Sequence, residues 1–416
     1  MVSRIAQQTT TLDRVVGLLV ALSLFSVFLM PSQSGASFPT YVVAVLALVA
    51  GADRWRPFLE SRLLGALFVA LLLYFSSSVW WSTEHPMRSA LSVYSRCLLI
   101  VTFVGALSSS LARIPNLMQW LSRGLAVSGG IAAVAALINL RLHPTWDGRL
   151  TGLGQLDNSV VAALAFDGGM LFALSCAIAE VTWWRAIGTV GVAVISLAVY
   201  ATGSRNGYLA GAVGIWILIV TNLRPASPAR LLWLAAPLLA AATLGIAVFV
   251  ARPEWQGALL PRGDSFRLEI WNIEWQRLVE NGPWFGLGIL TRDDVALEGH
   301  TFLHSHSLYL SSALQGGLVG LLLLLSLLSC AGWRLLQAAH RPEAKLGAAL
   351  LATGMSAYLF DGWELIDKVG LSWLLLWVPV AIAMVVGVTS NMIGKTRESV
   401  GLNSAARASE VVGRKP

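Results

Sequence analysis

The stretch LHSHSLYLSSALQGGLVGLLLLLSLLS, residues 303–329, places two histidines directly before an apolar segment that is long enough to cross a bilayer. An ionisable pair at the mouth of such a segment marks a candidate functional site. The pair, His304 and His306, closes the polar stretch 252–305, which is the longest interval between apolar segments. The chemistry of this protein is therefore expected where that polar stretch meets the membrane.

The whole chain has the composition of a membrane protein. Hydrophobic residues make up 56% of its 416 residues and charged residues only 12%, with a mean hydropathy of +0.69, whereas soluble domains carry roughly 25% charge. We predict an all-α polytopic membrane protein with about 12 transmembrane helices. The predicted spans are 15–30, 38–52, 63–81, 89–111, 121–140, 159–180, 184–201, 206–222, 231–251, 307–329, 345–360 and 371–389.

Basic residues are distributed unevenly between the two sides of this predicted bundle. Arginine and lysine gather at the termini and in alternate loops. Because basic loops face the cytoplasm, both termini are predicted to be cytoplasmic and the loop 252–305 external. The net charge of +7 follows from this bias and from a basic cytoplasmic tail at 395–416, so no nucleic-acid partner is expected. The membrane domain is predicted to comprise 1–394.

The external loop contains a predicted amphipathic helix. Within GDSFRLEIWNIEWQRLVENGPWFGLG (263–288), the side chains of Leu268, Trp271, Trp275 and Leu278 fall on one helical face. An aspartate or serine at 264–265 can cap its start, and Asn-Gly-Pro stops it. We expect this helix to lie along the membrane surface with its tryptophans at headgroup depth.

Several arginines in the external segments are candidates for binding an anionic group. Arg205, in TGSRNGY (202–208), begins a predicted span, where helix N–H groups and a planar guanidinium together suit a phosphate. Arg267 begins the amphipathic helix in the same way. The alternative is a charge that lies at the interface or in solvent. The full set is Arg149, Arg205, Arg262 and Arg267. The glycines at 203, 207 and 211 more simply permit close helix packing.

Three of the six histidines, His300, His304 and His306, lie within seven residues. A zinc site would need three protein ligands at suitable spacing, and no HExxH-type spacing is present, so no metal is predicted. A histidine at a helix N-terminus is kept neutral by the helix dipole and can act as a general base. We assign that role to His306, with His304 orienting it. The alternative is a pair of histidines hydrogen-bonded at a loop–helix junction.

Two further features concern charge. Arg96 and Asp167 are the charges nearest the middle of predicted spans, where an isolated charge is expensive, and we predict that they form a structural ion pair. The acidic segment DGWELIDK (361–368) is predicted to line an acceptor route.

No nucleotide-binding motif is present. A group-transfer reaction on the outer face would therefore need a donor that carries its own leaving group, such as a lipid-linked diphosphate.

The order of four motifs resembles the O-antigen ligase and polymerase superfamily of bacterial inner membranes. The motifs are RLTGLGQLDN (149–158), GSRNG (203–207), SFRLEIW (265–271) and HSHSLYLSSALQGGLVG (304–320). The chain departs from the usual pattern at Ser307, where the family has asparagine.

The resemblance implies a GT-C-like enzyme that needs neither metal nor cofactor. It would transfer O-antigen glycan from undecaprenyl diphosphate to a sugar hydroxyl of the lipid A-core, on the periplasmic face. Arg205 and Arg267 would hold the diphosphate, and His306 would assist the acceptor hydroxyl. Further candidate substrate contacts are Asn158, Asn206, Trp271 and His300.

Other functions stay open at this point. An O-antigen polymerase or a protein O-oligosaccharyltransferase would share the motifs. A lipid-linked oligosaccharide flippase or transporter would also have about twelve spans, but its binding charges should lie near the bilayer midplane. Here the charges gather at the outer rim, which favours catalysis.

Overall fold

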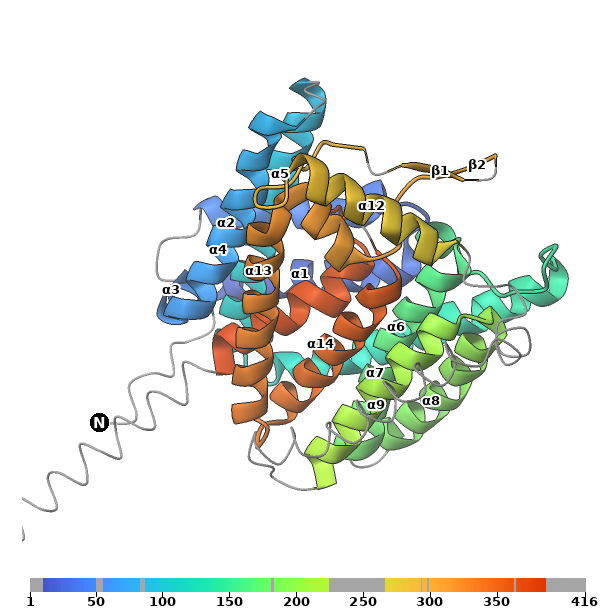
Figure 1. Ribbon diagram of the computed structural model, residues 1–416. Coiled ribbons are helices and arrows are strands. Elements are labelled where there is room, and N and C mark those ends of the chain that lie inside the picture. The colour runs from blue at the N-terminus through green and yellow to red at the C-terminus, as the bar shows by residue number, and fades with distance from the viewer. Residues whose placement is uncertain are drawn as a thin grey trace, which may run out of the picture.

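The computed structural model describes residues 10–49, 55–82, 87–180, 183–223, 266–292, 294–297, 299–362 and 364–386. Figure 1 shows a helical bundle with one helix, α12, lying across its end. The elements are α1 (Thr11–Leu29), α2 (Gln33–Val49), α3 (Arg56–Glu60), α4 (Arg62–Ser77), η3 (Ser78–Trp81), α5 (Met87–Arg113), α6 (Leu117–Leu142), η4 (Gly154–Leu156), α7 (Ser159–Ala179), α8 (Trp183–Thr202), α9 (Arg205–Leu223), α12 (Arg267–Asn281), β1 (Val295–Leu297), β2 (His300–Phe302), α13 (Leu308–Gln337), α14 (Pro342–Phe360) and η5 (Trp373–Trp377).

A helix occupies each predicted span that lies within the described residues. Eight helices in these ranges are long and apolar enough to cross a membrane: α1, α4 with η3, α5, α6, α7, α8, α9 and α13. The predicted spans at 38–52, 345–360 and 371–389 correspond to α2, α14 and the shorter apolar helix Trp373–Val386. The predicted span 231–251 and the tail 395–416 lie outside the described residues. The chain is thus an all-α, multi-pass membrane protein, while the total of twelve spans stays a prediction.

Side-chain caps fix where several helices begin. The hydroxyl of Thr10 accepts from the backbone N–H of Asp13, whose carboxylate accepts from the N–H of Thr10 in return, a reciprocal pair that satisfies two donors of the first turn. Asn158 caps α7 and Ser307 caps α13 through their side-chain oxygens. Asn158 and Leu308 line one pocket, so α7 and α13 start at the same end of the bundle.

Small residues let α9 pack closely against α7, as predicted for Gly207 and Gly211, whereas Gly203, with φ 61°, lies in the turn before α9. A Cβ atom added at Gly207 would lie 2.6 Å from the Cβ of Ala163, and one at Gly211 would lie 2.5 Å from Oδ1 of Asp167. Neither position leaves room for a ligand between the helices. These glycines therefore serve helix packing.

The predicted ion pair between Arg96 and Asp167 is wrong. Asp167 is fully buried on α7, and neither carboxyl oxygen has a hydrogen-bond partner among the described residues. The guanidinium of Arg96 instead pairs with Glu364, 3.1 Å away. Arg96 lies close enough to the end of its helix to reach the segment after α14, so the costly isolated charge is compensated there.

The amphipathic helix is confirmed as α12, which ends at Asn281 as the Asn-Gly-Pro sequence predicted. Its N-cap position is Phe266, with φ 60° and no side-chain cap; residues 264–265 lie outside the described part. Only part of the predicted apolar face packs against protein, and the position of its tryptophans at headgroup depth stays a prediction. Ile270 and Leu278 are buried, but Leu268 and Trp275 are 64% and 51% exposed. The buried face is set by the packing of α12 on α13 and so is rotated from the tryptophan stripe.

The loop after α12 is built into a break in α13. Gly317 has φ 62° and ψ −167°, which interrupts the helix. The N–H groups of Leu287 and Gly288 donate to the carbonyls of Leu314 and Gln315, at 2.8 and 2.9 Å. The backbone carbonyls of α13 that lose their helical partners at the break therefore accept hydrogen bonds from the loop. This connection holds α12 against the first half of α13.

Candidate active site

A pocket of about 260 Å³ lies at the end of the bundle where α7 and α13 begin. Five separate segments form it: the start of α2, the start of α7 with the residues before it, the start of α12, the histidine loop before α13, and the end of α14 with the segment after it. Its lining side chains include Asn158, Arg267, His304, His306, Asp361 and Glu364. Four of these six residues were candidates from the sequence.

His306 lies beside a carboxylate in this pocket. Its Nδ1 atom is 3.7 Å from Oδ1 of Asp361. The centroids of the His304 and His306 rings are 4.1 Å apart. His306 also has φ 53°, a left-handed conformation that is uncommon for residues other than glycine. Such backbone conformations persist only when neighbouring contacts hold them, and they cluster at functional sites.

Two serines hold the His306 turn. The hydroxyl of Ser305 donates to the carbonyl of Ser307 at 3.0 Å and accepts from its N–H at 3.3 Å. The Ser307 hydroxyl then caps α13 by accepting from Leu310 N–H. The helix therefore begins at Leu308, and His306 lies just outside it. Ser307, where the superfamily pattern has asparagine, fills the capping role.

His304 is a neutral imidazole at pH 7. Its pKa is lowered to about 4, first by burial and then by the neighbouring His306. The sequence predicted neutral histidines from the helix dipole. For His304 the larger cause is loss of hydration, because burial disfavours the charged form of a base.

Arg267 is the predicted arginine that reaches the histidines. It begins α12 and lines the same pocket, and its charge contributes to the lowered pKa of His304. The α12 helix is tied to the histidine loop by Trp271, whose indole N–H donates to the carbonyl of Ser305 at 2.8 Å. Trp271 also stacks on Phe360. Its observed role is therefore to hold the loop.

The other predicted arginines lie elsewhere. Arg149 donates from Nε to the carbonyl of Thr202 at 2.7 Å and lies against Gly203 in the α8–α9 turn. Arg205 begins α9 and is exposed. Neither side chain lines the pocket of Arg267. Arg262 lies outside the described residues.

The remaining candidates have separate positions. Asn158 lines the pocket while capping α7, and the Asn206 amide donates to the carbonyl of Ala357 at 3.0 Å, joining α9 to α14. His300 is exposed on β2 and does not line the pocket. Over the described ranges, no group of three histidine, cysteine, aspartate or glutamate side chains is arranged to hold a metal ion.

Comparisons with known proteins indicate which family this chain resembles. Residues 190–325 match the family model described as O-antigen ligase. A curated O-antigen ligase from Pseudomonas aeruginosa (strain PAO1) is 27% identical over 332 residues, which cover 79% of this chain and 78% of that protein. The predicted resemblance to the O-antigen ligases is confirmed. Both comparisons support an O-antigen ligase activity in general terms.

The segment that matches the O-antigen ligase model contains two of the candidate arginines and both pocket histidines. It ends before the acidic wall of the pocket, which is formed by Asp361, Glu364 and Asp367. Arg205, Arg267, His304 and His306 all fall within 190–325, whereas Asp361 does not. Sequence reasoning noted the acidic segment 361–368 but did not pair Asp361 with His306. The two are 55 positions apart in the printed numbering, and only the packing of α13 against α14 brings them together.

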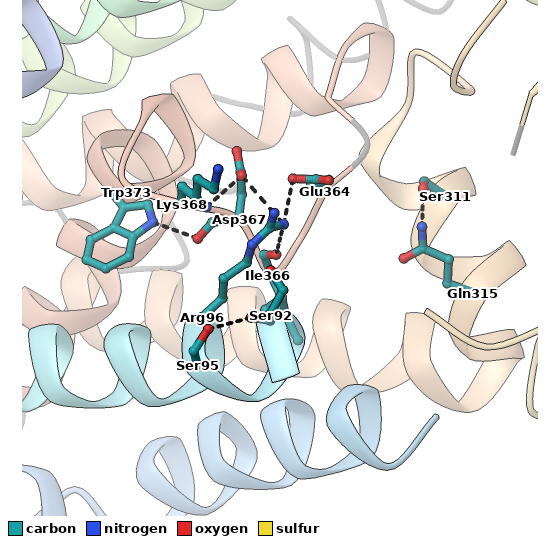
Figure 2. Close-up of polar contacts among 10 residues, drawn as sticks. All are labelled: Ser92, Ser95, Arg96, Ser311, Gln315, Glu364, Ile366, Asp367, Lys368 and Trp373. Carbon is teal, nitrogen blue, oxygen red and sulfur yellow. Dashed lines mark hydrogen bonds and ion pairs between the residues drawn. The ribbon is translucent and has the colours of Figure 1, made fainter. Parts of the chain in front are cut away.

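The acidic wall is anchored by Arg96. Figure 2 shows its guanidinium pointing from α5 to the segment that holds Glu364 and Asp367. Nη1 lies 3.1 Å from Glu364 and 3.9 Å from Asp367, and it donates to the carbonyl of Ile366 at 3.3 Å. Burial and the Asp367 carboxyl raise the pKa of Glu364 to about 8, against the opposing effect of Arg96. Glu364 thus sheds part of its charge near neutral pH.

Proposed function

We propose that this protein transfers an O-antigen glycan from undecaprenyl diphosphate to a sugar hydroxyl of the lipid A-core. The oxygen of the acceptor hydroxyl attacks the anomeric carbon, and the bond from that carbon to the diphosphate oxygen breaks. The diphosphate leaves with the electron pair. The reaction as proposed uses no metal and no cofactor, since the charge that develops can be stabilised by guanidinium groups and helix N–H groups.

The observation that carries this proposal is the pair of His306 and Asp361 beside Arg267 in one pocket. Because Nδ1 of His306 faces Asp361 at 3.7 Å, its Nε2 is the nitrogen that takes the proton of the acceptor hydroxyl. The carboxylate then stabilises the imidazolium that forms, as in other base–carboxylate pairs. His304 stays neutral and positions His306.

Arg267 supplies the positive charge for the diphosphate. Asp361, Glu364 and Asp367 also line this pocket, so a diphosphate is expected beside Arg267 rather than beside the carboxyl groups. Arg205 and Arg149, at the α8–α9 turn, together with Arg262, are proposed as further contacts of the donor. Asn158, Asn206, Trp271 and His300 stay predictions as substrate contacts.

We further propose that the pocket faces the periplasm from the inner membrane and that both termini are cytoplasmic. The support comes from the direction of the helices. α5 and α13 start at the pocket end and carry Arg113 and Arg334 in their last turns. Basic residues at helix ends favour the cytoplasmic side, which puts the pocket on the other side.

Reconstitution tests the reaction. The purified protein in liposomes receives lipid-linked O-antigen and lipid A-core, with excess chelator in a parallel sample. The proposal predicts core-linked glycan and free undecaprenyl diphosphate in both samples. Longer lipid-linked glycan without core-linked product would indicate a polymerase, and glycan moved across the bilayer without bond exchange would indicate a flippase; either result contradicts the proposal.

A further inference from the structure

A second polar pocket, of about 210 Å³, lies on the other side of the Glu364 segment. It is formed by the first turns of α5, the loop before β1 and the break in α13. Its polar lining side chains are Ser89, Ser92, Arg96, Gln315 and Glu364. Ser89, Ser92 and Arg96 recur at helical spacing, so one face of α5 supplies three hydrogen-bonding groups.

The guanidinium in this second pocket already has carboxyl partners. Arg96 is the one basic side chain among the described residues that line it, and its guanidinium is paired with Glu364 and lies near Asp367 (Figure 2). A phosphate would have to compete with both carboxyl groups for the same cation. A neutral ligand with hydroxyl groups does not face that competition.

The pocket also offers donors and acceptors that a neutral hydroxylated ligand can use. The Nε of Arg96 is buried and has no hydrogen-bond partner among the described residues. Gln315 donates to Ser311 at 3.3 Å, and its amide adds a donor and an acceptor to the lining. Buried polar groups are normally paired, so a ligand hydroxyl beside Arg96 would complete the set.

The volume limits the ligand to a small one. Pockets for drug-sized ligands are about 300–1,000 Å³, and this pocket is below that range. A single sugar ring fits its size and its mixture of donors and acceptors. The apolar side chains of Ile289 and Leu290, which also line it, suit the C–H face of such a ring.

We propose that this second pocket binds one neutral sugar ring of a substrate, on the far side of Glu364 from His306. The inference rests on the proposed function and assigns a subsite that the first pocket does not contain. Glu364 lines both pockets. The neighbouring unit of a sugar held here can therefore extend past Glu364 toward the histidines. The ring belongs to the acceptor or to the donor glycan.

Substitutions on α5 test this subsite. Ser92→Leu fills the pocket, Ser92→Ala removes only a hydroxyl, and Ser95→Leu is the matched control on the exposed part of the same helix. The KM values for lipid A-core and for lipid-linked O-antigen are measured separately in liposomes. Ser92→Leu is expected to raise one of them roughly tenfold or more and Ser92→Ala to raise the same one by a smaller factor. Ser95→Leu should leave both within about twofold.

The arms of the experiment separate the two sources of the sugar. A raised KM for lipid A-core assigns the ring to the acceptor, and a raised KM for the lipid-linked glycan assigns it to the donor; both support the subsite. Unchanged KM values for Ser92→Leu and Ser92→Ala would overturn it while wild-type transfer still upholds the proposed function. Absence of transfer by the wild-type protein would instead overturn the function.

Discussion

The Nδ1 atom of His306 lies 3.7 Å from the Oδ1 atom of Asp361, across the junction of the histidine loop and the end of α14. The pair joins a base to the carboxylate that can stabilise its charged form. The role of Asp361 can therefore be tested by substitution in the same way as that of His306.

Asp361→Asn should slow transfer without unfolding the protein. The amide keeps the shape of the carboxyl but cannot stabilise an imidazolium, so we expect the rate to fall roughly ten- to a hundredfold. Transfer is measured as initial rates in liposomes. Asp294→Asn, at an exposed position outside the pocket, is the control. Equal rates for wild type and Asp361→Asn would show that the pair has no part in the reaction.

The buried His304 predicts that stability depends on pH. Its pKa is about 4 in the folded protein, below the ordinary value of 6.5 for a histidine in an unfolded chain. Between these values the unfolded chain binds more protons, so the free energy of unfolding falls as the pH falls from about 6.5 toward 4 and does not depend on His304 above that window. Melting temperatures in detergent at pH 7.5 and 5 check this. His304→Gln should melt with a smaller difference between the two pH values, and an unchanged difference would contradict the assignment.

Gly317→Ala should destabilise the protein. Its φ of 62° is strained for alanine, and the added Cβ would overlap the carbonyl of Trp284 in the loop built into α13. A cost of about 1–3 kcal/mol is expected. Gly332→Ala, in the same helix with its nearest neighbour 3.6 Å away, should be neutral or stabilising. Thermal melting in detergent compares them, and equal melting for both variants would show that the break is not needed.

Arg267→Lys should weaken binding of the glycan donor more than binding of the acceptor. Lysine keeps the charge but lacks the planar fork that binds phosphate through two donors. We expect the KM for lipid-linked glycan to rise roughly tenfold. Arg277→Lys changes another arginine on the same helix, one that donates to the backbone carbonyls of Arg292 and Asp294, and should have little effect. A donor KM that is the same in both variants would place the diphosphate elsewhere.

The sequence predicted those features that depend on local pattern. The spans follow from apolar length, the end of α12 from Asn281 and the glycine and proline after it, and the cluster around His304 and His306 from spacing along the chain. Each of these features depends on residues that lie close together in the sequence. The close packing of α9 on α7 followed in the same way from small residues at regular spacing.

Features that depend on which distant segments meet were missed. Arg96 had two acidic regions within reach in principle, and a single sequence does not tell that Glu364 is its partner. The side of α12 that packs against protein, which carries Ile270, was not predicted, and this packing leaves Trp275 exposed. Insertion of the loop at Gly317 likewise depends on tertiary hydrogen bonds that leave no local signature.

The central claim is that His306 takes the proton of the acceptor hydroxyl. The most direct measurement is the rate of glycan transfer to lipid A-core by purified His306→Ala protein in liposomes, with His340→Ala, at an exposed position between α13 and α14 and outside the pocket, as the matched control. Loss of a general base predicts a rate lower by about 10²–10⁴, with donor binding retained and the control unaffected. A His306→Ala protein that transfers glycan as fast as the wild type would contradict the account.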